Sequence, residues 1–346
     1  MGVEPRRALE RIEPYVPGLS LEALKEAKGI AEAVKLASNE NPLGAGRLAR
    51  EAAQKAVAEL HLYPDGDSAA LRARLARELG VGPENIALGC GSDELIRLLA
   101  EAYLDPGDAA VFADVTFSQY AFAARLMDAL EVAVPLAPGD VHDLPAMAEA
   151  ARKHRARLCF VCNPNNPTGT YVAREAVAAF LDAVPDETLV VFDEAYFEYV
   201  TAGDFPDIVS EVKKGRNVAV LRTFSKIHGL AGLRVGYAVA SPAVVQALDR
   251  VRPPFNVNRV AQAAALAALD DREHVEASRR LNATERARLA QEFEAMGLTV
   301  RPSQTNFLFV DLGRPADPVY EALLNAGVIV RMGSSFGRPT SLRITV

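Results

Sequence analysis

Strand-like apolar runs alternate with amphipathic segments through the middle of the chain, and this alternation constrains the fold most. The apolar runs span residues 109–113, 158–162, 189–193, 218–221 and 235–240. Segments with helical periodicity, such as residues 174–183, lie between most of them. Several runs are apolar at every position, as expected in a sheet that is covered on both faces. The pattern predicts an α/β fold with a mostly parallel, doubly wound sheet.

The regions on either side of this alternation have a different character. Helical periodicity marks residues 48–60, 68–79 and 92–103 before it, and residues 242–251 and a long stretch over 258–296 after it. Short strand-like runs follow at 307–311, 328–331 and 342–346. Helices followed by a few strands favour a smaller α+β domain. We therefore expect a large domain over 39–245, a small C-terminal domain over 246–346, and an N-terminal arm over 1–38 that joins the small domain.

The bulk properties exclude several classes of protein. The 346 residues carry a net charge of −7, which gives no general attraction for nucleic acid. No apolar run reaches the roughly 18 to 20 residues that a membrane helix needs, and the charged N-terminus is unlike a secretory signal. Cys159 and Cys162 form a C-x-x-C motif, but they lie three apart in a strand-like run, and no second pair follows at zinc-ligand spacing. We expect no metal, no membrane and a reducing cytoplasmic location.

Lys226 is the candidate whose chemistry the sequence indicates most clearly. It follows the run at 218–221, with Ser225 before it and Arg234 eight residues later. Taken singly, a lysine and an arginine beside a loop are surface residues. Together, a lysine that can form a Schiff base and an adjoining hydroxyl and guanidinium suit an aldehyde that carries a phosphate ester. Pyridoxal 5'-phosphate is the cofactor with that combination.

Other polar residues follow neighbouring strand-like runs. Asp193 ends the run at 189–193, where a carboxylate could hold a pyridine nitrogen protonated. A metal-binding or structural aspartate is the alternative, although the chain has no G-x-x-x-x-G-K-[ST] motif to support a Mg²⁺-dependent ATPase. Asn166 lies in the turn at 163–169, which is either a rigid connection or a source of an amide for the site.

A glycine-containing turn and an aromatic residue complete this group of candidates. Gly91, Ser92 and Asp93 open a helix whose free N–H groups could bind phosphate, although Ser92 could equally be a plain N-cap. The acidic side chains there must turn away from any phosphate. Phe117 could stack on a planar ring or belong to the core.

Two arginines near the end of the chain stand within apolar runs. Arg331 closes one run and Arg343 lies inside another. A permanent cation in an apolar strand is unfavourable unless an anion compensates it, and arginine binds carboxylate or phosphate in a bidentate manner. Both residues are therefore candidate anion ligands.

The ordered set of these residues resembles the fold-type I pyridoxal-phosphate-dependent aminotransferases over nearly the whole chain. The resemblance implies that Lys226 forms the Schiff base and that Asp193 pairs with the pyridine nitrogen. It implies that Tyr196 and Asn166 bind the ring hydroxyl and that Phe117 stacks on the ring. Ser225, Arg234 and the backbone at residues 91–93 would hold the phosphate.

Within that superfamily the chain is most similar to the histidinol-phosphate aminotransferases, through the motifs at residues 14–18, 36–44, 63–65 and 342–345. This implies transamination between histidinol phosphate and 2-oxoglutarate, with Tyr15, Asn166, Arg331 and Arg343 at the substrate. It also implies a homodimer in which Tyr63 reaches the cofactor phosphate of the other subunit. Three features depart from the family: Phe117 stands where tyrosine is common, residues 114–116 replace a proline-containing approach to it, and only three residues follow Arg343.

Other functions remain open at this stage. An aromatic or aspartate aminotransferase would share the scaffold, and a threonine-phosphate decarboxylase also binds a phosphorylated amine. A non-enzymatic sensor domain of a transcription regulator would need a DNA-binding module, and no basic recognition helix precedes Asn39.

Overall fold

A seven-stranded sheet forms the centre of the larger part of the molecule. The computed structural model describes residues 3–14 and 19–346. The strand order is β2-β8-β7-β6-β5-β3-β4, with bounds β2 Ile86–Gly89, β3 Ala109–Ala113, β4 Leu130–Val134, β5 Leu158–Cys162, β6 Leu189–Asp193, β7 Val218–Thr223 and β8 Gly236–Val239. β4, β3, β5, β6 and β7 run parallel, whereas β8 is antiparallel to both β7 and β2. The predicted mostly parallel sheet is confirmed.

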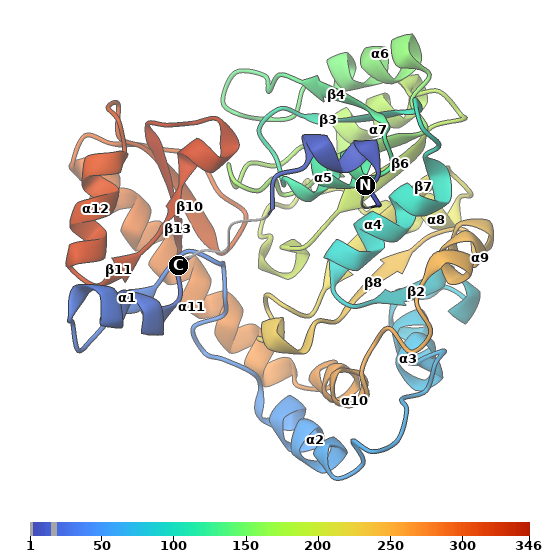
Figure 1. Ribbon diagram of the computed structural model, residues 1–346, viewed down its shortest axis with the longest axis horizontal. Helices are drawn as coiled ribbons and strands as arrows, with labels where there is room; N and C mark the ends of the chain where they lie inside the picture. The colour runs from blue at the N-terminus through green and yellow to red at the C-terminus, as the bar shows by residue number, and fades with distance from the viewer. Residues whose placement is uncertain (1–2, 15–18) are drawn as a thin grey trace.

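Helices cover both faces of this sheet, as Figure 1 shows. One core lies between one face and α4 (Ser92–Tyr103), α5 (Gln119–Leu126) and α9 (Pro242–Val251). The opposite core includes residues of α2 (Arg47–Val57), α3 (Ala69–Leu79), α6 (Leu144–His154), α7 (Arg174–Ala183), α8 (Ile208–Lys213) and α10 (Arg259–Ala268). Cys159 packs in one core and Cys162 in the other, as strand geometry requires of residues three apart.

The smaller part combines both ends of the described chain. β12 (Arg331–Met332), β13 (Ser341–Thr345), β10 (Phe307–Asp311) and β9 (Thr299–Val300) form an antiparallel sheet in that order. β1 (Val34–Lys35) pairs in parallel with β11 (Val328–Ile329). Figure 1 shows α1 (Leu21–Lys28) and α12 (Asp317–Asn325) in this part. The run predicted as one strand at 328–331 is thus two strands in different sheets, since the chain passes from one sheet to the other at buried Val330.

The stretch of helical periodicity predicted over 258–296 is helical, but it is interrupted once. It is two helices, α10 and α11 (Arg272–Ala295), separated by a turn at 269–271. Asp271 is the N-cap of α11 and accepts a hydrogen bond from the His274 amide at 3.3 Å. Its other oxygen accepts from the Leu48 amide at 3.2 Å, which ties the start of α11 to the start of α2. Capping at Asp271 breaks a periodicity that is otherwise continuous.

None of the helices in the described ranges is both apolar enough and long enough to cross a bilayer. The domain boundaries at residues 39 and 246 stay predictions, because the two parts share several contacts. Figure 1 shows α11 running from the neighbourhood of α10 into the smaller part.

Candidate active site

The carboxyl ends of three adjacent parallel strands open into one cavity of about 630 Å³. β5 leads to the Asn166 turn, β6 ends at Asp193, and β7 leads to Lys226. The same edge is where open parallel sheets gather their ligands. Eleven of the predicted site residues line the cavity: Ser92, Asp93, Phe117, Asn166, Asp193, Tyr196, Ser225, Lys226, Arg234, Arg331 and Arg343.

Two of the described residues predicted for the site do not line this cavity. Gly91 stands directly behind the cavity wall at the N-cap of α4. Tyr63 is exposed on the surface and does not line this cavity. Tyr15 lies outside the described residues.

Lys226 projects into the cavity from the loop after β7. Its Nζ donates a hydrogen bond to the Ser38 carbonyl oxygen at 3.1 Å and lies 5.8 Å from the centre of the Tyr196 ring. Burial, reinforced by the positive charge of Arg343, lowers the pKa of Lys226 to about 8. A substantial fraction of this amine is therefore neutral and nucleophilic just above neutral pH.

Asp193 is buried at the floor of the cavity with one oxygen still available. Oδ2 accepts a hydrogen bond from the Tyr120 hydroxyl at 2.7 Å, whereas the buried Oδ1 has no hydrogen-bond partner among the described residues. Burial raises the pKa of Asp193 to about 6, and the Tyr120 hydrogen bond opposes that shift. An N–H or cationic group at Oδ1 would satisfy it, because buried carboxylate oxygens need partners.

Tyr196 and Asn166 are held by side chains that reach the cavity from other elements. The Tyr196 hydroxyl accepts from Asn39 Nδ2 at 2.9 Å, and burial raises the pKa of Tyr196 above its usual range. Asn166 Oδ1 accepts from Arg343 Nη1 at 2.6 Å. The Tyr196 phenol therefore stays protonated across the ordinary pH range, and the Asn166 amide is oriented with its NH₂ group free to point elsewhere.

The start of α4 and the loop that carries Lys226 form a polar corner of the cavity, which is called the phosphate corner below. Arg234 Nη1 lies 3.4 Å from Ser225 Oγ, and its Nη2 pairs with Asp93 at 3.2 Å. Gly91 has a φ of +82°, and a Cβ there would lie 2.5 Å from Arg234 Nη2. Only glycine therefore lets the guanidinium approach the α4 N-terminus. A hydroxyl, a guanidinium and free helix N–H groups together suit a phosphate.

The two acids at this helix start behave differently. Glu94 turns back and accepts hydrogen bonds from the Cys90 amide and from Asn256 Nδ2, each at 2.6 Å, as the predicted phosphate site requires. Asp93 instead lines the cavity and pairs with Arg234, although its side chain is about half exposed. An anion at this corner would compete with Asp93 for the guanidinium.

Arg331 and Arg343 face each other across the antiparallel strands β12 and β13. Like charges directly opposite on a sheet are destabilising, yet both line the cavity and Arg343 is only 6% exposed. Arg343 donates to Asn166 and to the Ala37 carbonyl oxygen, and Arg331 forms no ion pair with a described carboxylate. An anionic ligand between them would relieve the repulsion.

Three residues that shape the site were not singled out from the sequence. Tyr120 orients Asp193, Asn39 orients Tyr196, and Thr223 accepts a hydrogen bond from the Ser225 amide at 3.1 Å. Phe117 lines the cavity and packs edge-on against Tyr120, with ring centres 5.8 Å apart. Tyr120 follows Phe117 by three residues, but nothing in the sequence separates a buried tyrosine of the site from one of the core.

This fold, with a depressed-pKa lysine, an unsatisfied buried aspartate and an anion corner in one cavity, defines a pyridoxal-phosphate-dependent enzyme of the aminotransferase type. Comparisons agree: residues 31–346 match the model of the family "Aminotransferase class I and II". The chain is 51% identical to a histidinol-phosphate aminotransferase from Moorella thermoacetica, covering 99% of this chain and 88% of the relative. It is 49% identical to one from Symbiobacterium thermophilum, covering 99% and 93%.

A solved structure agrees in three dimensions. The histidinol-phosphate aminotransferase from Sinorhizobium meliloti in complex with pyridoxal-5'-phosphate matches with a TM-score of 0.89 and 32% identity, over 97% of this chain and 93% of that chain. The chain belongs to the class I and II aminotransferase family, within its histidinol-phosphate aminotransferase branch.

Proposed function

We propose that this enzyme transfers the amino group of L-histidinol phosphate to 2-oxoglutarate, giving imidazole acetol phosphate and glutamate in histidine biosynthesis. The observation that carries the proposal is the facing pair Arg331 and Arg343 in the same cavity as Lys226. Histidinol phosphate has no α-carboxylate, so its phosphate is the anion for these arginines. The acceptor 2-oxoglutarate presents carboxylates that the same guanidinium groups can bind.

The polar groups of the cavity fit pyridoxal phosphate one by one. Asp193 Oδ1, which lacks a partner, would accept from the pyridine N–H. Tyr196 and Asn166 would bind the ring hydroxyl, and Phe117 would stack on the ring. Ser225 and Arg234 would hold the phosphate, together with the backbone at Gly91, Ser92 and Asp93. When bound, the cofactor acts as an electron sink that stabilises negative charge on the substrate carbon.

Lys226 has two roles in this proposal. Its neutral amine would hold the cofactor covalently. Once a substrate amine has displaced it, the freed Nζ would take the proton from the amine-bearing carbon of the substrate as a general base and give it to the C4′ carbon of the cofactor as a general acid. The pKa of about 8 suits both roles, because the group can accept and donate a proton near the operating pH. Asn39 and Tyr120 would hold Tyr196 and Asp193 in place through their hydrogen bonds.

We further propose a cytoplasmic homodimer with shared active sites. Tyr63 is 78% exposed and stacks on the exposed Phe255, and Leu60 and Leu62, which precede it closely in the sequence, are exposed as well. Such a patch is typical of an interface, and Tyr63 of one subunit would reach the cofactor phosphate of the other. Tyr15 would contact the substrate. The domain division at residues 39 and 246 belongs to the same proposal.

A coupled glutamate-release assay tests the substrate. The purified enzyme is supplied with 2-oxoglutarate and, in separate reactions, histidinol phosphate, phenylalanine, aspartate or threonine phosphate. We expect the highest kcat/KM with histidinol phosphate, because only this amine combines a phosphate with the absence of an α-carboxylate. A higher value with phenylalanine or aspartate contradicts the proposal, as does carbon dioxide release from threonine phosphate without glutamate formation.

A further inference from the structure

The Tyr63 loop, residues 63–68, holds an exposed aromatic ring in a fixed position. The ring of Tyr63 stacks on that of Phe255, with centres 4.7 Å apart and planes inclined by 22°. Phe255 has a φ of +59°, an uncommon conformation for a bulky residue, and its ring also lies 3.4 Å from where a Cβ on Gly66 would be. An ordered tyrosine that remains mostly in water is prepared for a contact outside its own chain.

The backbone of the loop is fixed by hydrogen bonds at several points. The two oxygens of Asp65 accept from the amides of Asp67 and Ala69 at 3.0 and 2.7 Å. Arg259 donates to the Tyr63 carbonyl oxygen at 2.7 Å, and Gln262 donates to that of Asp65 at 2.9 Å. Each of these hydrogen bonds restricts the loop before a partner binds, which lowers the entropy lost on binding.

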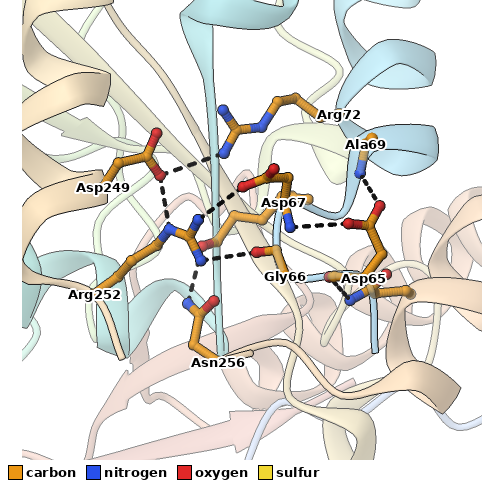
Figure 2. Close-up of polar contacts among 10 residues, drawn as sticks. Asp65, Gly66, Asp67, Ala69, Arg72, Asp249, Arg252 and Asn256 are labelled. Carbon is orange, nitrogen blue, oxygen red and sulfur yellow. Dashed lines mark hydrogen bonds and ion pairs between the residues drawn. The ribbon is translucent and has the colours of Figure 1, made fainter. Parts of the chain in front are cut away.

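Arg252 is the centre of this arrangement (Figure 2). Its guanidinium donates to the Gly66 carbonyl oxygen at 2.9 Å, to Asp67 at 3.2 Å and to Asp249 at 2.7 Å. Asp249 is also shared with Arg72 at 3.4 Å. The side chain of Arg252 is 15% exposed, so these bonds are partly shielded from water. One side chain therefore joins the end of α9 to the Tyr63 loop.

The same segment reaches the phosphate corner of the cavity. Four residues after Arg252, Asn256 donates to the Leu88 carbonyl oxygen at 3.1 Å and to Glu94 at 2.6 Å. Glu94 in turn accepts from the amide of Cys90, next to Gly91. The Tyr63 loop and the glycine turn before α4 are thus attached to a single short segment.

We propose that Arg252 is a positioning residue for the cofactor site of a second copy of this chain: it holds the Tyr63 loop so that the Tyr63 hydroxyl is presented to the partner's cofactor phosphate. This inference rests on the proposed shared active sites. Arg252 itself touches neither cofactor nor substrate, so its loss acts on cofactor affinity through Tyr63.

A double-mutant cycle tests the link. The dissociation constant of pyridoxal phosphate is measured by titrating the apoenzyme of the wild type, Arg252→Met, Tyr63→Phe and the double variant. We expect Tyr63→Phe to weaken cofactor binding roughly tenfold, the size of one lost hydrogen bond to a charged group. Arg252→Met should weaken it by a similar factor, and the double variant should be no weaker than either single variant.

Hydrogen exchange gives a readout that is independent of the cofactor. Amides 66–69 should exchange faster in Arg252→Met apoenzyme than in the wild type, with unchanged exchange in β5 to β7. If Arg252→Met folds poorly, Arg252→Lys is measured in its place. The lysine keeps the positive charge, so this variant should retain part of the exchange protection and part of the cofactor affinity. Arg97→Met, which removes an exposed arginine paired with Glu101 on α4, is the matched control and should change neither quantity.

Mixed dimers distinguish action in the partner site from action in the same subunit. When Arg252→Met and Lys226→Ala chains are combined, the intact Lys226 pocket belongs to the Arg252→Met chain and receives Tyr63 from the other chain. We expect this pocket to recover the wild-type cofactor affinity, measured from the absorbance of lysine-bound cofactor. Persistent weak binding in the mixed dimer overturns the inference. An unaffected Tyr63→Phe overturns the shared-site proposal itself, whereas a weakened Tyr63→Phe with an unaffected Arg252→Met overturns the inference alone.

Discussion

The two sheets that border the cavity differ in how the charges of their arginines are compensated. On the large sheet, Arg222 of β7 pairs with buried Glu194 at 2.8 Å and lies over the Phe197 ring at 3.5 Å. Burial raises the pKa of Glu194 to about 7, and Arg222 opposes this shift. On the small sheet, Arg331 faces another arginine and no described carboxylate pairs with it. The first arginine has its counter-ion within the fold, whereas the second has no carboxylate partner among the described residues, and we propose that a ligand supplies it.

This difference suggests that the two sheets have different roles in the site. The large sheet leads to Lys226 and Asp193, which we propose hold the cofactor. The small sheet supplies Arg331 and Arg343, which we propose bind the anionic group of the substrate. Variants in the large sheet should therefore change kcat, and variants in the small sheet should change KM.

The largest effect on kcat is expected when the Lys226 amine, which follows strand β7 of the large sheet, is removed. Lys226→Ala should lower kcat by roughly a thousandfold or more, because it removes both the covalent attachment and the proton carrier. The absorbance of lysine-bound cofactor should disappear as well. Steady-state assays and a visible spectrum measure the two effects, with the exposed Lys213→Ala as the matched control. Full turnover in Lys226→Ala would end the proposed mechanism.

A smaller effect is expected on the small sheet. Arg331→Gln should raise KM for histidinol phosphate roughly ten- to hundredfold, since a hydrogen bond to a charged group contributes about 1.5–3 kcal/mol. The kcat at saturation should change much less. Steady-state kinetics separate the two parameters, and Arg314→Gln, an exposed arginine of the same part, is the control. An unchanged KM would show that Arg331 does not bind the substrate phosphate.

The smallest effect tests whether the two sheets are electrically coupled. The charge of Arg343 contributes to lowering the pKa of Lys226 to about 8. Arg343→Gln removes that contribution, so the pKa of Lys226 should rise and its amine should be protonated up to a higher pH. The pH dependence of Lys226 acylation in the apoenzyme, followed by peptide mass spectrometry, should shift upward. A downward shift, or a shift of equal size in Arg314→Gln, would contradict the coupling.

The sequence predicted the large sheet better than the small one, for physical reasons. β3, β5 and β6 have the predicted bounds, because buried strands between helices give unbroken apolar runs. β4 has no such signal, since it is an edge strand with exposed Leu130. The 328–331 run is divided between two sheets, and the 258–296 stretch is divided into two helices. In each case the sequence periodicity continues across the division and does not reveal it.

Prediction of the site residues from the sequence was limited in a similar way. Residues with distinctive chemistry, such as Lys226 and Arg343, could be selected from the sequence and do line one cavity. Tyr120 and Asn39 could not, because their importance lies in hydrogen bonds to Asp193 and Tyr196 across 73 and 157 positions of the chain. Their roles depend on tertiary contacts that no local pattern encodes.

The pairing of β1 with β11 has a consequence for biosynthesis. Val34 and Lys35 find their partners only at Val328 and Ile329. On the ribosome, the early segment must wait until residues 328–329 have emerged, while strands β2 to β8 can already assemble. Nascent chains should therefore acquire the large sheet first, and the arginine-bearing sheet should form only after residues 341–345 have emerged.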